Sequence, residues 1–366
     1  MRQADEEAEG QDGDVRWRSG HGLRPGWSTG SSRPMSDDEL LRALVRQEIA
    51  GANHRLADYP ELRGRLSVEQ VRNSRSIEAA PVWRIEADGT SWFRFHAASW
   101  ERFPELIFSR WVAMLPLVAA VIAAGRPGRC WFNLGDEAHR PGLTFCGNAP
   151  EHVPVPDPYF MASQGYAALR DGFARQDVPW RERAPVAFWR GTTTGPYQTP
   201  LDAYPRVLLS RLGRSMGARA DIGLSSVTDE HRDRLPSLAG EGLVKDFVPA
   251  DRFDRYQLHI DIDGNSNSWP GLLSKLHSGG AVIKVESQQG YRQWYYDRLE
   301  PWVHYVPACA DLSDLADRIG LLLGDPALAE KIGRAGQELA RRMTIEAEIE
   351  RITPIAAAAF ESFEAA

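Results

Sequence analysis

The segment Asp261–Trp269 (DIDGNSNSW) has the composition of a loop that binds an anion. An apolar run ends in Asp263 and Gly264, small polar residues follow, and Pro270 falls at the first position of an expected helix, where its missing N–H costs little. Free N–H groups at a helix start, aided by serine hydroxyls, bind phosphate. An ordinary strand-to-helix loop whose Asn and Ser side chains only cap the helix explains the pattern equally well, since no Walker or GxGxxG spacing is present. The residues of the anion-binding interpretation are Asp263, Gly264, Asn265, Ser266, Asn267, Ser268 and Trp269.

Arg190 lies at the end of a second apolar run, directly before Gly191 and Thr192. An arginine at the carboxyl end of a strand can donate to two phosphate oxygens at once. A surface salt bridge is the alternative for such a residue, but the glycine and threonines that follow favour anion binding.

Lys275 and Lys284 are further candidate cations. Lys284 falls inside the apolar run AVIKVES, where an unpaired charge is costly. We therefore expect it to have a partner, which is Asp263, Glu286 or a ligand phosphate.

Asp136 ends the strand-like run CWFNLGD (130–136). A carboxylate at a strand end is well placed to accept a proton from a hydroxyl nucleophile. The alternatives are an Asx-turn or a helix cap, and the neighbouring Glu137 and His139 are also titratable. Asp136 is nevertheless the candidate catalytic base.

We expect no metal site and no cofactor. The sequence has no HExxH motif and no paired histidine ligands, and Asp261-Ile262-Asp263 matches a DxD triplet only literally, within an alternating strand. The three cysteines lack CxxC spacing, so neither a disulfide framework nor a zinc site is indicated.

The elements that position these residues alternate between strands and helices, which predicts an α/β fold with parallel sheets. A hairpin is expected around Asp88-Gly89, and the region 82–135 is otherwise poor in helix. Further strands are expected at 130–136, 187–191, 256–264, 281–287 and 302–308, with helices at 37–57, 200–216, 269–278, 312–324, 326–343 and 345–364.

Domain boundaries follow from composition. Residues 1–35 are polar and without periodicity, so they are expected to be disordered, and Met35 before a good helix start is an alternative initiator. The stretch near 176–186 is expected to divide an N-terminal domain (36–178) from a C-terminal domain (179–345). A last helix (346–366) is expected to cross back toward the first domain.

The bulk properties are those of a globular enzyme: 43% of residues are hydrophobic and 25% are charged. A formal net charge of −7 disfavours nucleic acid as a partner. The apolar run 111–125 is too short to span a bilayer and contains Pro116, so we expect a buried helix there. The first residues lack the apolar core of a signal peptide, and we expect a cytoplasmic protein, with at most peripheral contact at the inner face of a membrane.

Four blocks of the sequence resemble glycosyltransferase family 90, which includes lipopolysaccharide-modifying, capsule-associated and protein O-glucosyltransferase enzymes. They are FWRGTTTG (188–195), HIDIDGNSNSW (259–269), LHSGGAVIKVES (276–287) and QWYYDRLEPWVHYVPACADLSDL (293–315). The resemblance implies a GT-B type fold, with two Rossmann-like domains facing a central cleft, and an inverting, metal-independent transfer from a UDP-sugar.

The resemblance also assigns roles to residues of this chain. It makes Arg190 a contact of the donor diphosphate, the Gly264–Trp269 turn part of the donor site, and Asp136 the catalytic base. Trp269-Pro270 replaces a Phe-Arg of the animal enzymes, so Lys275 is expected to substitute for a second donor arginine. The expected acceptor is a glycan or glycolipid such as lipopolysaccharide or capsule. The alternatives are another nucleotide-sugar enzyme on the same fold, or a non-catalytic carbohydrate-binding or assembly protein.

Overall fold

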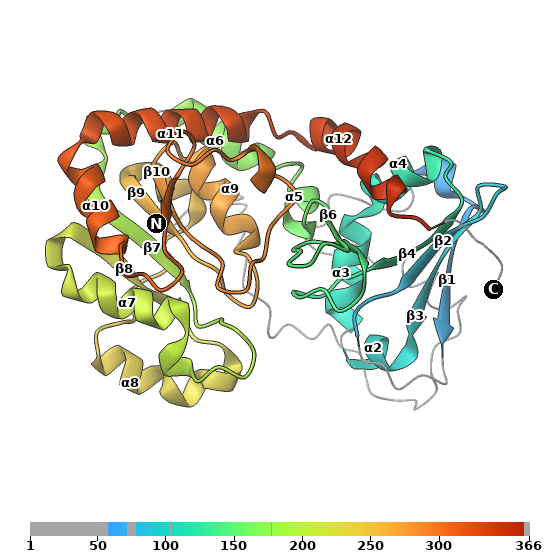
Figure 1. Cartoon of the computed structure of the whole chain (residues 1–366), viewed down its shortest axis with the longest axis horizontal. Helices are drawn as coiled ribbons and strands as arrows, with labels where there is room; N and C mark the ends of the chain where they lie inside the picture. The colour runs from blue at the N-terminus through green and yellow to red at the C-terminus, as the bar shows by residue number, and fades with distance from the viewer. Residues whose placement is uncertain (1–57, 72–77, 103, 177, 362–366) are drawn as a thin grey trace, which may run out of the picture. The chain divides into compact units, whose positions relative to one another are not determined.

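The computed structural model describes residues 58–71, 78–102, 104–176 and 178–361 (Figure 1). Within these residues the chain forms two β-sheets with helices packed against them, which confirms the predicted α/β class. The expected disorder of residues 1–35 and the helix expected over 37–57 lie outside the described residues.

The first sheet has six strands in the order β1-β3-β2-β4-β5-β6. It is mixed, because β2 runs antiparallel to β3 and β4 while the other neighbours are parallel. The β2–β3 pair is the predicted hairpin. Alternate residues of these strands, including Trp83, Ile85 and Phe93, are buried on one face. The strands are β1 (Leu66–Val71), β2 (Val82–Ile85), β3 (Ser91–His96), β4 (Gly128–Phe132), β5 (Gly142–Thr144) and β6 (His152–Pro154).

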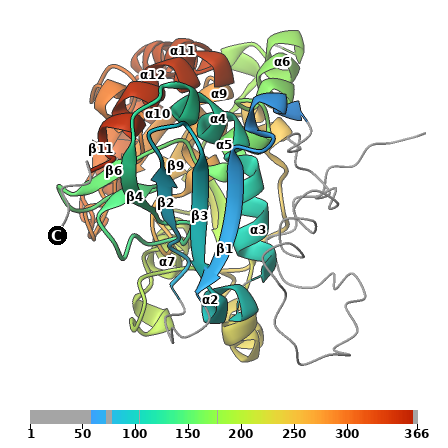
Figure 2. The same cartoon turned by 90° about the vertical axis from the view of Figure 1, so that its right-hand side faces the viewer.

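Helices α3 and α4 cover one face of this sheet (Figure 2). The apolar run 111–125 forms the end of α3 and all of α4, and it is buried as predicted, with Pro116 in the first turn of α4. The region between β3 and β4 is richer in helix than the sequence suggested, because it is divided into short helices that give little periodic signal. The helices of this half are α2 (Ala97–Arg102), α3 (Pro104–Ala113), α4 (Leu115–Ala123), α5 (Pro158–Ala162) and α6 (Ala167–Gln176).

The second sheet has five strands, all parallel, in the order β11-β10-β9-β7-β8. The runs 256–264 and 281–287 are neighbours in it, as predicted. Strands β9 and β10 are buried almost throughout, as strands covered on both faces must be. Strand β8 was not expected, because ADIGLSS contains few residues that favour strands. The strands are β7 (Ala184–Thr192), β8 (Ala220–Ser226), β9 (Tyr256–Asp261), β10 (Ala281–Val285) and β11 (Val306–Ala308).

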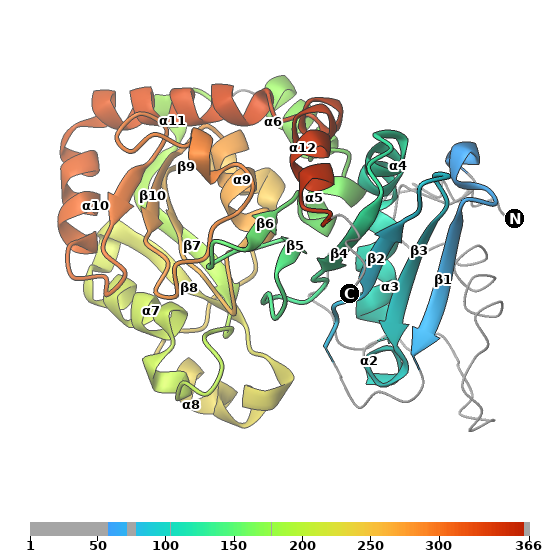
Figure 3. The ribbon, with the colours of Figure 1, turned by 45° about the vertical axis from the view of Figure 1, so that its right-hand side comes forward.

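Helices cover both faces of the second sheet (Figure 3). Leu258, Ile260 and Ile283 belong to the core formed with α7 and α10, whereas Val282 belongs to the core formed with α9. This arrangement is Rossmann-like. The helices are α7 (Pro205–Ser215), α8 (Leu235–Gly240), α9 (Trp269–His277), α10 (Leu315–Gly324), α11 (Pro326–Arg341) and α12 (Ile345–Ala358).

The C-terminal helix α12 returns to the first sheet, as expected. It packs on α4, and the ring of Phe360 meets Trp83 with 5.0 Å between centroids. The buried Glu348 of α12 accepts hydrogen bonds from Trp294 and Arg298. One buried core runs from the first sheet into α9 and α12, so the domain boundaries at 178/179 and 345/346 stay a prediction. Among the described residues, no helix is both long and apolar enough to cross a membrane.

Candidate active site

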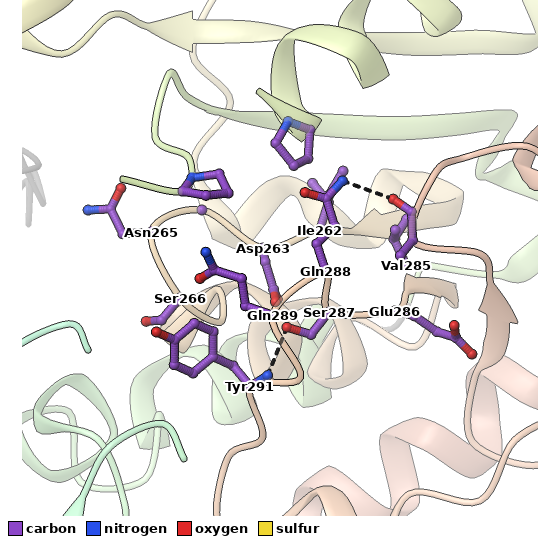
Figure 4. A pocket seen from close by; sticks show the side chains of 14 residues that line it. Ile262, Asp263, Asn265, Ser266, Val285, Glu286, Ser287, Gln288, Gln289 and Tyr291 are labelled. Atoms are coloured by element: carbon purple, nitrogen blue, oxygen red, sulfur yellow. Dashed lines mark hydrogen bonds between the residues drawn. The ribbon is translucent and has the colours of Figure 1, made fainter. Parts of the chain in front are cut away.

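A pocket lies at the carboxyl edge of the second sheet (Figure 4). Strand β7 has β8 on one side and β9 on the other, so the chain reverses its direction of sheet growth between β7 and β9. Ligands of open parallel sheets bind beyond the strand ends at such a point. The pocket is lined by the loops that follow β7, β9, β10 and β11: Pro196, Pro205, Ile262, Asp263, Gly264, Asn265, Ser266, Val285, Glu286, Ser287, Gln288, Gln289, Tyr291 and Ala310.

The loop after β9 supplies four of the predicted anion-binding residues to this pocket, from Asp263 to Ser266. Position 264 has no room for a side chain, because a Cβ on Gly264 would overlap the Thr194 hydroxyl and lie 3.0 Å from the Cζ of Arg206. Burial raises the pKa of Asp263 above its usual range, and its carboxylate accepts a hydrogen bond from Asn267 at 3.1 Å. Asn267 therefore stabilises the loop through Asp263 without lining the pocket itself.

Arg206, in the first turn of α7, does not line the pocket but holds two of its loops, and the sequence motifs did not reveal it. Its guanidinium donates to the carbonyls of Asp263 (3.0 Å) and Thr192 (3.2 Å) and to the Thr194 hydroxyl (2.6 Å). Burial lowers the pKa of Arg206 to about 10, so it stays protonated at neutral pH. A cation in the first turn of a helix opposes the helix dipole, and this was the available signal that Arg206 needs partners outside its own helix.

Asp136 lies in a turn held by the buried Asn133. The Asn133 amide donates to the carbonyls of Arg140 and Leu143 and accepts from the backbone N–H groups of His139 and Arg140, all within 3.1 Å. These bonds fix the chain on both sides of Asp136 and leave its side chain 39% exposed. The exposed His139 contributes its backbone to this turn.

The two carboxylate oxygens of Asp136 have different partners. Oδ1 accepts from Arg110 of α3 at 2.7 Å, and Oδ2 accepts from the side-chain amide of Asn265 at 3.0 Å. Burial raises the pKa of Asp136, but the Arg110 charge and the two hydrogen bonds outweigh burial and hold the pKa below its usual range. Asp136 is therefore an ionised carboxylate next to the pocket loop, as a base requires.

Trp269, the first residue of α9, lies beneath this pair. The Arg110 guanidinium stacks on its ring at 4.6 Å, and the indole N–H donates to the Cys146 sulfur at 2.8 Å. Trp269 thus supports Arg110, the partner of the candidate base Asp136, and does not line the pocket.

Arg190 does not line the pocket. Its guanidinium binds the Asp221 carboxylate at 2.8 Å and the carbonyls of Asp221 and Asp246. Its neighbours Gly191 and Thr192 also lie outside the lining, and the Thr192 hydroxyl contacts that of Ser226 at 2.5 Å. The structure gives Arg190 the salt bridge that was its alternative, and its contact with a diphosphate stays a prediction.

Lys275 and Lys284 both form salt bridges with Asp261, which was not among the expected partners of Lys284, and Lys284 also interacts electrostatically with Asp263, which was. The distances are 2.8 Å from Lys275 and 3.8 Å from Lys284, and all three side chains are buried. Ser268 donates to the same carboxylate at 2.6 Å. These residues stabilise the interior behind the loop, and none of them lines the pocket.

The loop after β10 completes the pocket. Glu286 was predicted; Ser287, Gln289 and Tyr291 were not, although polar residues directly after a buried parallel strand were a usable signal. The Ser287 hydroxyl accepts from the backbone N–H of Tyr291 at 2.9 Å, which folds the loop back toward Asp263 (Figure 4). The pocket combines hydroxyls, amides, carboxylates and one aromatic ring.

The sequence model described as glycosyl transferase family 90 matches residues 163–349, half of the chain. The chain belongs to glycosyltransferase family 90. Its two α/β units, one of them an all-parallel Rossmann-like sheet, agree with the predicted GT-B type, although the first sheet is mixed. Asp136 lies outside the matched range, and its role as a base stays a prediction.

Relatives of this chain include protein O-glucosyltransferases. The chain is 32% identical over 162 residues to protein O-glucosyltransferase 2 of Danio rerio, covering 44% of this chain and 29% of the relative. It is 25% identical over 203 residues to protein O-glucosyltransferase 1 of Homo sapiens, covering 55% and 47%. The chain thus spans less than half the length of these relatives.

Among solved structures, the chain is similar to Anabaena Alr3699/HepE in complex with UDP, with 13% identity and a TM-score of 0.36 over 52% of this chain and 55% of that one. It is also similar to TarM, with 12% identity and a TM-score of 0.37 over 50% and 37%.

Proposed function

We propose that this protein transfers a hexose or pentose from a UDP-sugar to an acceptor hydroxyl by an inverting displacement that needs no metal ion. The observation that carries the proposal is the contact between Asp136 and Asn265. It sets an ionised carboxylate 3.0 Å from a loop that lines a pocket at the switch point of a parallel sheet, within a family of glycosyl transferases.

In the proposed reaction Asp136 is the general base. The acceptor oxygen forms a bond to the anomeric carbon as the bond from that carbon to the β-phosphate oxygen breaks, and UDP leaves with the electron pair. Asp136 takes the proton of the acceptor hydroxyl during the attack. Because the acceptor and UDP occupy opposite faces of the sugar, a single displacement inverts the anomeric configuration.

The leaving UDP develops negative charge on its β-phosphate, which fixed groups of the protein must stabilise. We assign this task to the N–H groups of the loop after β9 and to the positive charge of Arg206, whose guanidinium is bonded to the Asp263 carbonyl in that loop. The carboxylates of Asp263 and Glu286 could accept hydrogen bonds from the ribose hydroxyls of UDP. The ring of Tyr291 could stack on its uracil ring.

The acceptor is proposed to be a surface glycan such as lipopolysaccharide or capsule, reached from the cytoplasmic side of a membrane. The names of the relatives favour glucose among the possible sugars, since those proteins are O-glucosyltransferases.

A binding and turnover experiment tests the proposal. The full chain is titrated with UDP by calorimetry and screened by thermal shift against UDP-glucose, UDP-xylose and GDP-mannose. A ligand that binds only the native state raises the melting temperature. We expect the UDP-sugars to stabilise the protein and GDP-mannose to have no effect. UDP release with transfer to an added glycan supports the proposal. Epimerised donor, a requirement for inorganic phosphate, or binding without turnover would each point to one of the alternative functions.

A further inference from the structure

The side chain of Asn265 connects three parts of the active site. It lines the pocket from the loop between β9 and α9 (Figure 4). Its Nδ2 donates to Asp136 Oδ2 at 3.0 Å, and its Oδ1 accepts from the backbone N–H of Gly195 at 3.3 Å. Gly195 belongs to the loop after β7, on the other side of the switch point. One amide therefore joins both loops of the sheet edge to the carboxylate proposed as base.

The second partner of Asp136 rests on the same segment of chain. Arg110 is anchored to the Leu134 carbonyl at 2.7 Å and stacks on Trp269, four residues after Asn265. A charge-assisted bond between Arg110 and Oδ1 is stronger than the bond from a neutral amide to Oδ2. Oδ2 is therefore the oxygen free to change partner when the loop after β9 moves.

We propose that Asn265 is a positioning residue that couples occupation of the donor pocket to the orientation of the Asp136 carboxylate. The proposal rests on the function proposed above. A donor seated on the loop sets the position of the Asn265 amide, and the amide in turn sets the direction in which Oδ2 accepts the acceptor's proton. The base is then correctly aligned only when the donor is bound.

Loss of the Asn265 amide is expected to change the pH dependence of kcat. The other charged and titratable groups around Asp136 also influence that dependence. Arg110 of α3 and Tyr159 of α5 interact electrostatically with the Asp136 carboxylate. Glu137 and His139 follow it in its own turn, and Asp157 before α5 interacts with Arg110. Every one of these groups is retained when Asn265 alone is replaced, so a change in profile reports the lost amide.

The test compares Asn265→Ala and Asn265→Asp with the control Ser266→Ala, which alters the next pocket residue in the same loop. Calorimetry gives the affinity for UDP, and turnover of UDP-glucose with and without acceptor gives KM and kcat from pH 3 to pH 8. Thermal melts confirm that each variant folds.

For Asn265→Ala we expect kcat to fall about 10- to 100-fold, as misaligned reacting groups do, with UDP affinity changed less than about fivefold. The acid limb of kcat should move to higher pH, since the charged carboxylate loses a donor, and Asn265→Asp should move it further through like-charge repulsion. Ser266→Ala should alter KM for the donor and leave the limb in place.

Asn265→Ala with a raised donor KM but wild-type kcat and acid limb would overturn the coupling and make Asn265 a simple donor contact. A wild-type protein that neither binds UDP nor turns over UDP-sugars would instead overturn the proposed function itself. The two failures are therefore distinguishable in one set of measurements.

Discussion

Replacing Asp136 by asparagine tests the proposed base while disturbing little else. In the Asp136→Asn variant the new amide oxygen can still accept from Arg110, but the new NH₂ group faces the Nδ2 donor of Asn265, so one hydrogen bond is lost. The ion pair with Arg110 is also lost, and because Asp136 is 39% exposed but Arg110 only 13%, this partly screened pair contributes about 1–2 kcal/mol.

The expected effects on binding, stability and rate differ in size. The lost hydrogen bond is worth about 1 kcal/mol, which limits the change in UDP affinity to about fivefold. Loss of a general base costs about 10²–10⁴ in rate. At about 1.36 kcal/mol for each factor of ten, this is about 2.7–5.4 kcal/mol of activation free energy, well above either structural effect. Transfer should therefore collapse in a protein that folds and binds UDP.

The assay measures UDP release at saturating donor for wild type, Asp136→Asn and the matched neighbour Glu137→Gln, with calorimetry for UDP and thermal melts on each. Because the pKa of Asp136 lies below its usual range, wild-type kcat should be flat between pH 5 and pH 8. Asp136→Asn with kcat within tenfold of wild type would refute the assignment. If Glu137→Gln alone abolished transfer, Glu137 would be the base.

Five further outcomes are expected. Arg206→Ala should weaken UDP binding at least tenfold by calorimetry, since it removes the positive charge and the guanidinium's bonds, while Arg190→Ala should lower the melting temperature and leave UDP affinity within about twofold. Gly264→Ala should destabilise the protein by about 1–3 kcal/mol in urea titrations and abolish UDP binding, because its Cβ has no space. Transfer should persist in excess EDTA, because fixed protein groups match the diphosphate charge; manganese-dependent rescue would contradict this. Burial lowers the pKa of both His259 and His277 to about 3. The unfolded chain binds their protons near pH 6.5 and the native state does not, so the free energy of unfolding should fall by up to about 1.4 kcal/mol per pH unit per histidine as pH drops from 6.5 toward 3, a slope that His277→Gln should reduce.

The sequence predicted those parts of the fold that carry a strong local signal. Strands β9 and β10 are buried apolar runs, and helix α9 has a proline at its second position, so their positions and their pairing followed directly. Strand β8 and the short helices between β3 and β4 lack such a signal and take their form from tertiary packing. The loop from Asp263 to Ser266 could be placed at the pocket because it follows a predicted strand.

The local sequence pattern could not predict the direction in which a side chain points. Arg190, at the end of β7, looked like a diphosphate contact, but whether it points to the sheet edge or to the neighbouring strand depends on what β8 places beside it. Because β8 was not predicted, its carboxylate at Asp221 could not be foreseen as the partner. Lys284 is a parallel case, since its pairing with Asp261 depends on the register between β10 and β9.

The partners of Arg206 could not be predicted from the local sequence either, although here the structure adds a candidate residue instead of removing one. Its partners lie 12 to 57 residues away in sequence, at the ends of β7 and β9, and they meet only because those two strands are neighbours across the switch point. Its buried guanidinium donates hydrogen bonds there only to carbonyls and a hydroxyl, although the Asp263 and Asp261 carboxylates also interact with it electrostatically. An arginine hydrogen-bonded directly to a carboxylate, as Arg190 is to Asp221, contributes mainly to stability, whereas an arginine without such a bond retains more of its field for an anionic ligand. On this argument the positive charge for the diphosphate comes from Arg206 of α7, and the matched comparison of Arg206→Ala with Arg190→Ala decides between them.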